Sequence, residues 1–400
     1  MNLNFVPLKS LSPFATDFSS MKKLLQVYNK SKRLVIGLMS GTSLDGVDSV
    51  LIRIQGSGFN TSFEILAFET AAISDVIKKQ IKQCFNGNTQ EICRLNYDLG
   101  NLYADQILQF LSKYSVKLKD VDLIGSHGQT IYHCHQHSTL QIGEPEIIAQ
   151  KTNTVVISNF RAADIAVGGS GAPLVPYLDY ILFHDTHQKT ALQNLGGIGN
   201  VTYISGKARE DIIAFDTGPA NTILNELTEI ITRGTKAFDK NGFYSKQGEI
   251  KTELLTFLMD HPYFSQQLPK STGREQFGKA YVEDVLKSFP KISQVDVLRT
   301  FVRFITKCIY LGYQHNLPAV DQIFCSGGGA DHPLIMSDLR QFFGDKIHHF
   351  EKIKGINSDA KEAVAFALLA HEKINGVPTN IPSVTGASKN ISLGVISVPD

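Results

Sequence analysis

The feature that most constrains the fold is a pattern of two apolar, β-like runs joined by a glycine-rich bend, which occurs twice. The first copy is "VIGLMSGTSLDGVDSVLIRI", residues 35–54, and the second is "ALQNLGGIGNVTYI", residues 191–204. Residues of high β-propensity flank each bend, so each copy predicts two strands joined by a short loop. Glycine permits a tight turn where a Cβ would not fit. A chain that repeats this opening is expected to have two related halves.

The segments around these bends alternate between strand-like and helix-like patterns. Apolar residues recur at helical spacing over 74–84 and 91–114, and residues 250–315 are largely helical. Buried strands are predicted within "VDLIGSHGQTIYH", "TVVISNF", "IIAFDTGPAN" and "IFCSGGGADHP". The first is expected to end in a loop that contains His127, and the last leads through a third glycine loop into a helix. Because 400 residues exceed the usual size of a single core, we predict two α/β domains that face a shared cleft.

The composition excludes several classes of function. Hydrophobic residues make up 42%, charged residues 19%, and the net charge is +1, which argues against nucleic acid as a partner. No apolar run approaches the roughly 18 residues of a membrane span. The five cysteines form no CxxC pair and indicate reduced thiols in a cytoplasm. Residues 1–33 lack a secretory signal and predict either a flexible lead or a short helix near Met21 to Tyr28.

The glycine-rich bends have two interpretations, an ordinary turn or a phosphate cradle made of backbone N–H groups and hydroxyls. The third loop precedes a helix N-terminus, which favours an anion. The aspartates of the first bend would repel a phosphate unless a cation lay between them. No Walker loop occurs. The candidate ATP- or phosphate-binding residues are Gly41, Thr42, Ser43, Asp45, Gly46, Asp48, Gly196, Gly197, Gly199, Asn200, Gly327, Gly328 and Gly329.

Taken together, the three glycine loops resemble those of the actin-like ATPases, a superfamily that includes sugar kinases and heat-shock ATPases. From about residue 34 to about residue 394, the chain resembles the anhydro-N-acetylmuramic acid kinase family. The matching stretches are "GLMSGTSLDGVD", "GSHGQTIYH", "TLQIGEP", "FRAADIAVGGSGAPLVP", "NLGGIGNVT", "FDTGPAN", "AFDKNG", "PKSTGREQFG", "CSGGGADHP", "DAKEAVAFALLA" and "PTNIPSVTGA".

This resemblance implies a two-domain actin-like, ribonuclease H-like α/β fold with the active site in the interdomain cleft. It implies an enzyme that uses ATP and Mg²⁺ to convert 1,6-anhydro-N-acetylmuramic acid to N-acetylmuramic acid 6-phosphate, while water opens the anhydro ring. It further implies a cytoplasmic homodimer that acts in peptidoglycan recycling.

The expected domain limits follow the two glycine bends. Residues 1–33 are an N-terminal extension, 34–175 the first domain and 176–400 the second, with a helical insert around 245–320. A C-terminal segment that packs back on the first domain is an alternative to its staying with the second.

The reaction that the resemblance implies needs a general base, for which Asp164 is the candidate. A base must reach the attacking water, and Asp164 follows a buried strand and precedes a glycine loop, where a side chain can be rigidly aimed. The alternative is an aspartate that caps a turn or pairs with Arg161. The resemblance implies a supporting catalytic role for Glu362, which matches a glutamate near the family's active site. The alternative is a solvated carboxylate that the N-terminus of its helix favours. Two carboxylates that share a water push their pKa values apart, which suits one of them as the base.

Four further residues are assigned to ligands. Arg161 is expected to orient Asp164 or to bind the carboxylate of the sugar's lactyl group. His127 is a candidate for substrate contact, with a structural histidine as the alternative. Asp216 is a second candidate, which would hold a metal-bound water or bind ribose, with a structural Asx-turn as the alternative. Asp45 is expected to act on Mg²⁺, which takes few carboxylates. The triplet His133, His135 and His137 lacks other ligating partners, which favours a solvated turn over a metal site.

The chain departs from the family pattern at four positions that bear on sugar contacts: Asn159, Ser170, Ala220 and Glu144. Another ATP-dependent sugar kinase is the alternative within the same class of function, and two functions of other classes remain open for this fold. An ATP-driven binding machine is disfavoured because no peptide-binding domain is evident after the last motif. A phosphohydrolase of long anionic polymers is disfavoured by the near-neutral charge.

Overall fold

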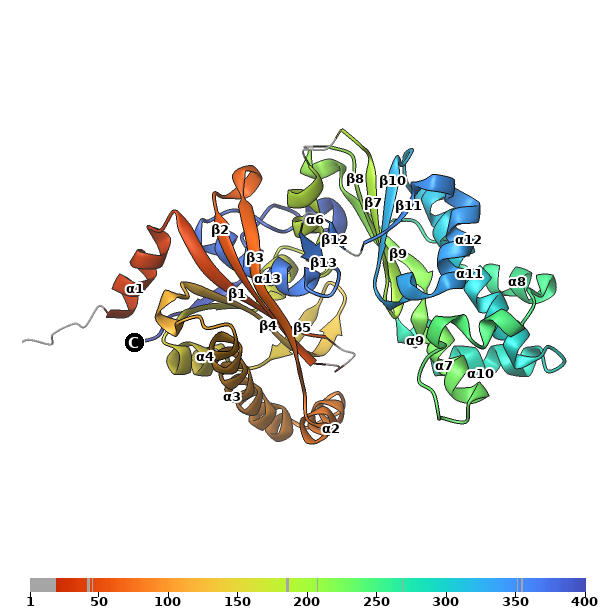
Figure 1. Ribbon diagram of the computed structural model, residues 1–400, viewed down its shortest axis with the longest axis horizontal. Helices are drawn as coiled ribbons and strands as arrows, with labels where there is room; N and C mark the ends of the chain where they lie inside the picture. The colour runs from red at the N-terminus through yellow and green to blue at the C-terminus, as the bar shows by residue number, and fades with distance from the viewer. Residues whose placement is uncertain are drawn as a thin grey trace, which may run out of the picture.

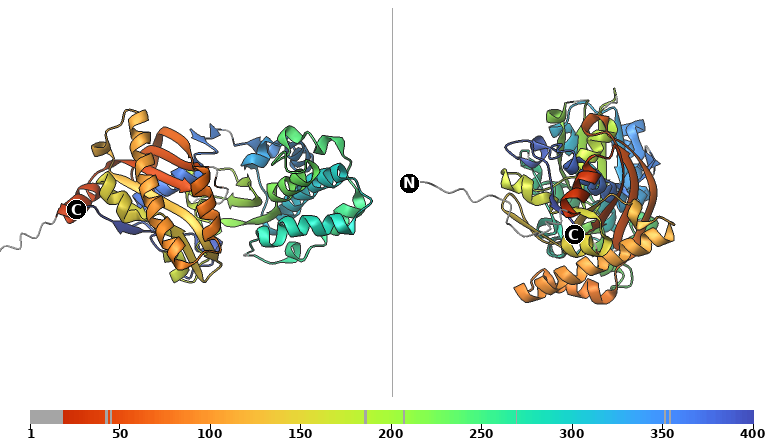
Figure 2. Two further views of the ribbon diagram at one scale, coloured as in Figure 1. Left: turned by 90° about the horizontal axis from the view of Figure 1, so that it is seen from below. Right: turned by 90° about the vertical axis from the view of Figure 1, so that its left-hand side faces the viewer.

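The computed structural model describes residues 19–41, 44, 46–184, 187–206, 208–268, 270–350, 352–353 and 355–400. Two lobes lie side by side, each with a β-sheet and helices packed against it (Figures 1 and 2). Each predicted glycine bend joins two adjacent antiparallel strands of one of these sheets. The repeated sequence pattern therefore marks the start of each lobe.

The first sheet has seven strands in the order β14-β6-β4-β1-β2-β3, with β5 paired to β4. β1, β2 and β3 form an antiparallel meander, and β4 and β6 follow in parallel beside β1. The strands are β1 (Lys32–Ser40), β2 (Gly46–Gln55), β3 (Ser62–Ala72), β4 (Leu123–Cys134), β5 (Ser138–Ile142), β6 (Val155–Ser158) and β14 (Val395–Ser397).

The second sheet repeats this topology with five strands in the order β9-β8-β7-β10-β11. β7, β8 and β9 are an antiparallel meander, and β10 and β11 join beside β7 in parallel. The strands are β7 (Thr190–Leu195), β8 (Ile198–Ile204), β9 (Ile213–Pro219), β10 (Gln322–Ser326) and β11 (Ile347–His349). The duplicated order confirms the predicted two-domain actin-like α/β fold.

Helices cover these sheets because successive strand residues point to opposite faces and both faces carry apolar side chains. In the first lobe, Ile36 and Leu38 pack toward α3, whereas Val35 and Leu123 pack toward α13. The first-lobe helices are α2 (Asp75–Cys84), α3 (Thr89–Lys113), α4 (Pro145–Thr152), α5 (Phe160–Ala166) and α13 (Lys361–Ile374). Asn88 and Glu91 begin α3 with a reciprocal capping box, which explains its sharp start.

The helices of the second lobe come mainly from residues 221–343. They are α7 (Asn221–Ile231), α8 (Thr252–Met259), α9 (Arg274–Phe277), α10 (Lys279–Ser288), α11 (Gln294–Asn316) and α12 (Pro333–Phe343). α6 (Pro176–Phe183) lies between the two lobes, as do the short strands β12 (Lys352–Ile353) and β13 (Ile356–Asn357) (Figure 1). α14 (Pro382–Thr385) packs beside β9.

The C-terminal part of the chain lies against the first sheet. α13 crosses it so closely that a Cβ at Gly37 would lie 2.0 Å from the carbonyl oxygen of Ala363. A Cβ at Gly125 would lie 2.3 Å from that of Phe366, so these two sheet glycines permit the contact. β14 then pairs antiparallel with β6. The residue limits expected for the two domains stay a prediction.

The N-terminal stretch is described from residue 19 onward, and there it forms α1 (Ser19–Tyr28). Residues 1–18 of the expected extension lie outside the described residues. Within the described part of the chain, every helix is too short or too polar to cross a membrane.

Candidate active site

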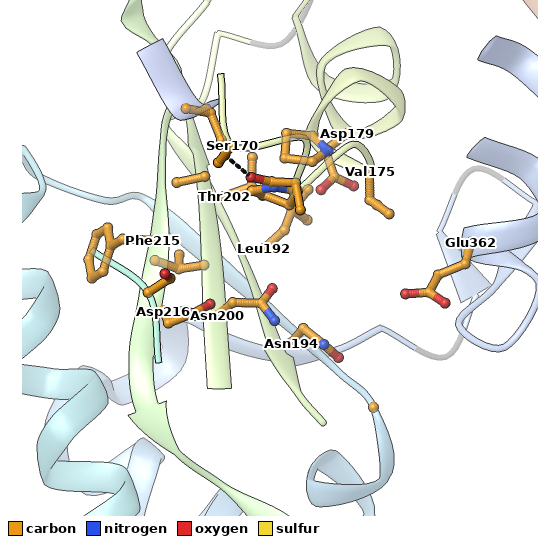
Figure 3. Close-up of a pocket in the computed structure, with 18 of the residues that line it drawn as sticks. Ser170, Val175, Asp179, Leu192, Asn194, Asn200, Thr202, Phe215, Asp216 and Glu362 are labelled. Atoms are coloured by element: carbon orange, nitrogen blue, oxygen red, sulfur yellow. Dashed lines mark hydrogen bonds between the residues drawn. The ribbon is translucent and has the colours of Figure 1, made fainter. Parts of the chain in front are cut away.

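A cavity of about 840 Å³ lies between the two lobes and takes its walls from both. β7, β8 and β9 contribute the wall of the second lobe, with Asn194, Asn200 and Asp216 at the surface of the cavity (Figure 3). Across the open space, the side chain of Glu362 points toward these residues from the start of α13 (Figure 3). Concave sites of this size between domains are typical of small-molecule enzymes.

Asp216 is the main ionisable group of the second wall. It lies in β9 opposite Asn200 of β8, and its Oδ2 accepts a hydrogen bond from the backbone N–H of Thr272 at 2.9 Å. Burial raises the pKa of Asp216 to about 6, the nearby Glu275 adds to this increase, and the Thr272 hydrogen bond opposes it. A carboxylate with a raised pKa in a cleft is a candidate functional group.

Glu362 is the main ionisable group of the first wall. Its side chain faces the cavity, yet the surrounding protein partly desolvates it and raises the pKa of Glu362. The positive charge of Arg161 opposes this increase, and the negative charge of Asp48 adds to it. Glu362 thus stands in the electrostatic field of both Arg161 and the β1–β2 bend.

Arg161 is held by two acceptors. Its Nε donates to Nε2 of His127 at 3.0 Å, and one of its terminal nitrogens donates to the carbonyl oxygen of Gly171 at 2.9 Å. Because arginine only donates, the His127 proton sits on Nδ1 and is donated to the carbonyl oxygen of Gly128 at 2.8 Å. Burial and the adjacent guanidinium hold the pKa of His127 well below its usual range, so the ring is neutral. Burial lowers the pKa of Arg161 to about 10, and Glu362 opposes this decrease.

His127 lies inside β4 rather than in a loop after it. The strand continues to Cys134 because β5 pairs with its second half. The imidazole is 3% exposed and packs on the ring of Phe366 in α13. In this position it contacts Arg161 and the core rather than the cavity.

Asp164 lies on the short helix α5 and is 0% exposed. Its Oδ1 accepts hydrogen bonds from Nδ2 of Asn380 and Oγ of Thr385, both at 2.9 Å. Its Oδ2 accepts one from the backbone N–H of Gly171 at 2.8 Å. A Cβ at Gly169 would lie 2.2 Å from Oδ2, so the glycine loop covers the carboxylate closely.

The glycine loops of the second lobe pack against each other. A Cβ at Gly327, which has a φ of 81°, would lie 2.6 Å from Oδ1 of Asn194. The carbonyl oxygens of Gly196 and Gly197 accept backbone hydrogen bonds from the first residues of α7. Gly327 lines the cavity. Packing and backbone conformation therefore account for the glycine at position 327, while the loop at Gly196 and Gly197 holds the start of α7.

The β1–β2 bend is described only in part, because Thr42, Ser43 and Asp45 lie outside the described residues. Asp48 lies at the start of β2 opposite Met39, and its carboxylate accepts a hydrogen bond from Oγ of Thr70 at 2.6 Å. Gly46 permits close pairing with β3, since a Cβ there would lie 2.6 Å from the methyl group of Thr70.

The chain matches one family of known proteins over nearly its whole length. The model of the anhydro-N-acetylmuramic acid kinase family matches residues 33–399. A protein of that name from Caldanaerobacter subterraneus is 42% identical over 396 residues, which cover 94% of this chain and 100% of the relative. One from Bacillus cereus is 44% identical over 381 residues, 91% of this chain and 99% of the relative. The chain belongs to the anhydro-N-acetylmuramic acid kinase family. It is therefore an enzyme of the phosphotransferase class.

Solved structures with a similar arrangement are more distant. Component A of (R)-2-hydroxyglutaryl-CoA dehydratase from Acidaminococcus fermentans covers 86% of this chain and 99% of its own, at 14% identity and a TM-score of 0.42. A ROK family glucokinase from Streptomyces griseus covers 85% and 99%, at 11% identity and a TM-score of 0.35.

The structure brings some predicted site residues of this kinase to the cavity and leaves others behind its wall. Asn200, Asp216, Gly327 and Glu362 line the cavity. Asp164, Arg161 and His127 lie behind the first wall and are joined by hydrogen bonds through the loop at Gly171. The remaining described residues of the predicted phosphate loops do not line the cavity: Gly41, Gly46, Asp48, Gly196, Gly197, Gly199, Gly328 and Gly329.

Several lining residues of this family member were missed by reasoning from the sequence. Residues 270–273 of the quoted "PKSTGREQFG" motif reach the cavity, and the motif was the signal that could have found them. Asp179 of α6 pairs with Lys361 of α13 at 2.6 Å, and both side chains line the cavity. These two residues lie far apart in the sequence, so no local sequence pattern predicts that they form an ion pair. His133 and His135, expected in a solvated turn, also line the cavity.

The departures from the family pattern have different positions. Ser170 lines the cavity, and its hydroxyl donates to the carbonyl oxygen of Ala172 at 2.5 Å. Glu144 caps α4 away from the cavity. Asn159 precedes α5 with a φ of 50°, a left-handed conformation that asparagine accommodates well. Ala220 is buried before α7. Ser170 is thus the departure placed to alter ligand contacts.

The fit of a magnesium ion depends on the available oxygens. Among the described residues, no three His, Cys, Asp or Glu side chains are grouped to hold a metal. Mg²⁺ needs fewer protein ligands than that, because it keeps several waters and binds substrate phosphates. Asp216 and Glu362 present carboxylate oxygens, which suit Mg²⁺, to the cavity, while the predicted ligand Asp45 lies outside the described residues.

Proposed function

We propose that this enzyme phosphorylates 1,6-anhydro-N-acetylmuramic acid with ATP in the cavity between its lobes, while water opens the anhydro ring. The product is N-acetylmuramic acid 6-phosphate, and the reaction serves peptidoglycan recycling in the cytoplasm. The observation that carries the proposal is the family match over residues 33–399. A cavity of about 840 Å³ with carboxylates on both walls supports it.

In the proposed reaction, the water oxygen attacks the anomeric carbon, and the bond from that carbon to O6 breaks. O6 takes the γ-phosphoryl group, ADP leaves, and the proton of the water goes to a general base. Asp164 is the proposed base, and Oδ2 is its proposed basic atom. Oδ1 already accepts two hydrogen bonds, whereas Oδ2 accepts one and retains a free lone pair.

Asp164 is fully covered in this structure, so the proposal requires the loop of residues 168–171 to move when substrates bind. This loop forms part of the cavity wall through Ser170. Movements of this kind, which complete a site on ligand binding, are common in enzymes with two lobes. The cover then also protects the base from bulk water before the sugar arrives.

Arg161 and Glu362 are proposed to act on the sugar side. The guanidinium is oriented by His127 and Gly171, and its field acts on the carboxylate of Glu362. Once the loop of residues 168–171 has moved, the guanidinium is proposed to pair with an anionic group such as the lactyl carboxylate. Glu362 carries a negative charge that would repel this anion, so its proposed role is to support Asp164 at the attacking water. His127 orients the arginine in this scheme. Asp216 and Asn200, with the glycine loops, are proposed to bind ATP.

Magnesium remains part of the proposal, with Asp45 as its proposed ligand. When bound, Mg²⁺ neutralises charge on the phosphates. We also propose that the enzyme is a homodimer and that it acts without nucleic acid or membrane partners. Its proposed domain limits are 34–175 and 176–400, with the C-terminal segment from α13 onward packed back on the first domain.

The proposal is tested by ADP release from the purified chain with and without 1,6-anhydro-N-acetylmuramic acid. We expect the sugar to stimulate turnover strongly, and mass spectrometry to detect one added water and one added phosphoryl group in the product. Incorporation of ¹⁸O from labelled water at the anomeric carbon would report the ring-opening step.

Glucose and N-acetylglucosamine serve as control sugars. Equal stimulation by a control sugar would replace the proposed substrate with another sugar. ATP turnover that no sugar affects would instead favour an ATPase binding machine.

A further inference from the structure

The carboxylate of Asp164 is held mainly by a segment more than 200 residues away in sequence. Two of its three hydrogen-bond donors, Asn380 and Thr385, belong to residues 378–388, here called the strap. The third is the backbone N–H of Gly171 in the glycine loop. Asn380 is 1% exposed and Thr385 is 2% exposed, so both donors act in the absence of competing water.

Each donor on the strap is itself fixed. Nδ2 of Asn380 also donates to the carbonyl oxygen of Lys389 at 3.0 Å, and its Oδ1 accepts from the N–H of Ile391 at 2.7 Å. These contacts determine which side of the amide faces Asp164. The carbonyl oxygen of Thr385 accepts from the N–H of Ser170 at 2.8 Å. The strap therefore holds both the carboxylate and the loop that covers it.

The other side of the strap is bound to the second lobe. Arg209, between β8 and β9, donates to the carbonyl oxygen of Pro378 at 3.0 Å and to that of Asn380. Ser383 donates from its Oγ to the carbonyl oxygen of Ile212 at 2.9 Å. One residue, Asn380, thus contacts Arg209 through its backbone and Asp164 through its side chain.

We propose that Asn380 and Thr385 are positioning residues for Asp164, and that Arg209 makes their position depend on the second lobe. This inference rests on the proposed role of Asp164 as the base. When the second lobe moves, Arg209 shifts the backbone of the strap at Asn380. The side chain of the same residue then shifts Oδ1 of Asp164. The strap links the arrangement of the lobes to the geometry of the chemical step.

The test is a double-mutant cycle between Thr385 and Asp164. Thr385→Val keeps the shape but removes the hydroxyl, and Thr385→Ser keeps the hydroxyl. Each is measured alone and with Asp164→Asn for kcat, for the KM of ATP and for thermal unfolding. We expect Thr385→Val to lower kcat about tenfold, because one hydrogen bond to a charged group is lost. Thr385→Ser should stay within about twofold, and the KM of ATP should not change.

In the Asp164→Asn background, Thr385→Val should have no further effect on the residual kcat, because the group it positions is already disabled. An equal tenfold loss in both backgrounds would overturn the inference and leave the role of Asp164 intact. Full activity of Asp164→Asn would overturn the proposed base itself. If Thr385→Val does not fold, Thr385→Ala takes its place in the cycle.

The link to the second lobe is tested with Arg209→Met, matched to Arg53→Met. Arg53 is an exposed arginine that pairs with exposed Glu64 at 2.8 Å. We expect Arg209→Met to lower kcat about fivefold, because the strap loses its two hydrogen bonds from Arg209 but keeps its own bonds to Asp164. This loss should vanish in the Asp164→Asn background, and Arg53→Met should leave kcat unchanged. An Arg209→Met enzyme with normal kcat would remove the second lobe from the proposal.

Discussion

The aspartates of the two lobes differ in their burial and in the number of hydrogen bonds that their carboxylates accept. In the first lobe, Asp164 is 0% exposed and accepts three hydrogen bonds. In the second lobe, Asp216 lines the cavity, and its carboxylate accepts one hydrogen bond, from the N–H of Thr272. The two sheets share a five-strand order. The difference is that the strap donates two hydrogen bonds to the carboxylate of Asp164 and, among the described residues, none to that of Asp216. One carboxylate is fixed in place, and the other is left open to a ligand.

The strongest test of this difference between Asp164 and Asp216 is to compare the kinetics of Asp164→Asn and Asp216→Asn. Loss of a general base lowers turnover by about 10²- to 10⁴-fold, so we expect a fall of this size in kcat for Asp164→Asn. The KM of ATP should stay within about twofold. For Asp216→Asn we expect the KM of ATP to rise about tenfold, as for one lost polar contact to a ligand, with little change in kcat.

Steady-state assays with both substrates varied provide these numbers. If Asp216→Asn abolished turnover while Asp164→Asn remained active, the open carboxylate would be the base. The two walls would then exchange their roles.

A second prediction concerns stability against pH. The pKa of Asp216 is about 6 in the folded protein and about 4 in an unfolded chain, so the folded state binds more protons between these values. Stability therefore decreases as pH rises from about 4 to 6, by up to about 3 kcal/mol, and stays lower above pH 6. Asp216→Asn lacks this loss and keeps an acceptor for Thr272.

The variant should consequently be more stable than the parent at pH 7.5 but not at pH 4. Chemical denaturation at both pH values measures the difference. An equal increase in the free energy of unfolding at both pH values would show that the charge on Asp216 does not cause the stabilisation.

The smallest expected effect tests how closely the first wall is packed. Gly169→Ala places a methyl carbon 2.2 Å from Oδ2 of Asp164, which is closer than van der Waals contact allows. Overpacking of this kind costs about 2 kcal/mol, so we expect a lower melting temperature together with a reduced kcat. Gly328→Ala, whose Cβ would meet nothing nearer than 3.6 Å, is the stability control. An unchanged melting temperature for both would show that the cover over Asp164 is loose.

Much of the fold was predictable, because its signal is local. The two glycine bends between β-like runs predicted the hairpins that begin each sheet, and helical periodicity predicted α2 and α3 within a few residues. The apolar residues of α13 do not specify the sheet against which this helix packs. The contact depends on Gly37 and Gly125, where a Cβ would clash with α13. In the sequence, nothing distinguishes them from other glycines in strands.

The environment of the candidate site was less predictable. Sequence could point to Asp164, but its partners Asn380 and Thr385 are 216 and 221 residues away, and nothing in their local pattern refers to it. For His127, the pattern suggested a loop after a strand, since the pairing of β5 that extends β4 is a tertiary effect. The contacts of the polar residues in this site are long-range hydrogen bonds. Such bonds produce no periodic pattern in the sequence from which they could be predicted.

The return of α13 to the first sheet has a consequence for synthesis on the ribosome. β6 ends at Ser158 and α13 begins at Lys361, so about 200 residues separate the sheet from the helix that covers its second face. At a synthesis rate of roughly 5–20 residues per second, that face stays uncovered for about 10–40 s until α13 has been made. All strands of the second sheet emerge during this interval. The nascent first lobe therefore exposes an apolar face while the second lobe is being made, which is the period when a chaperone would have most to protect.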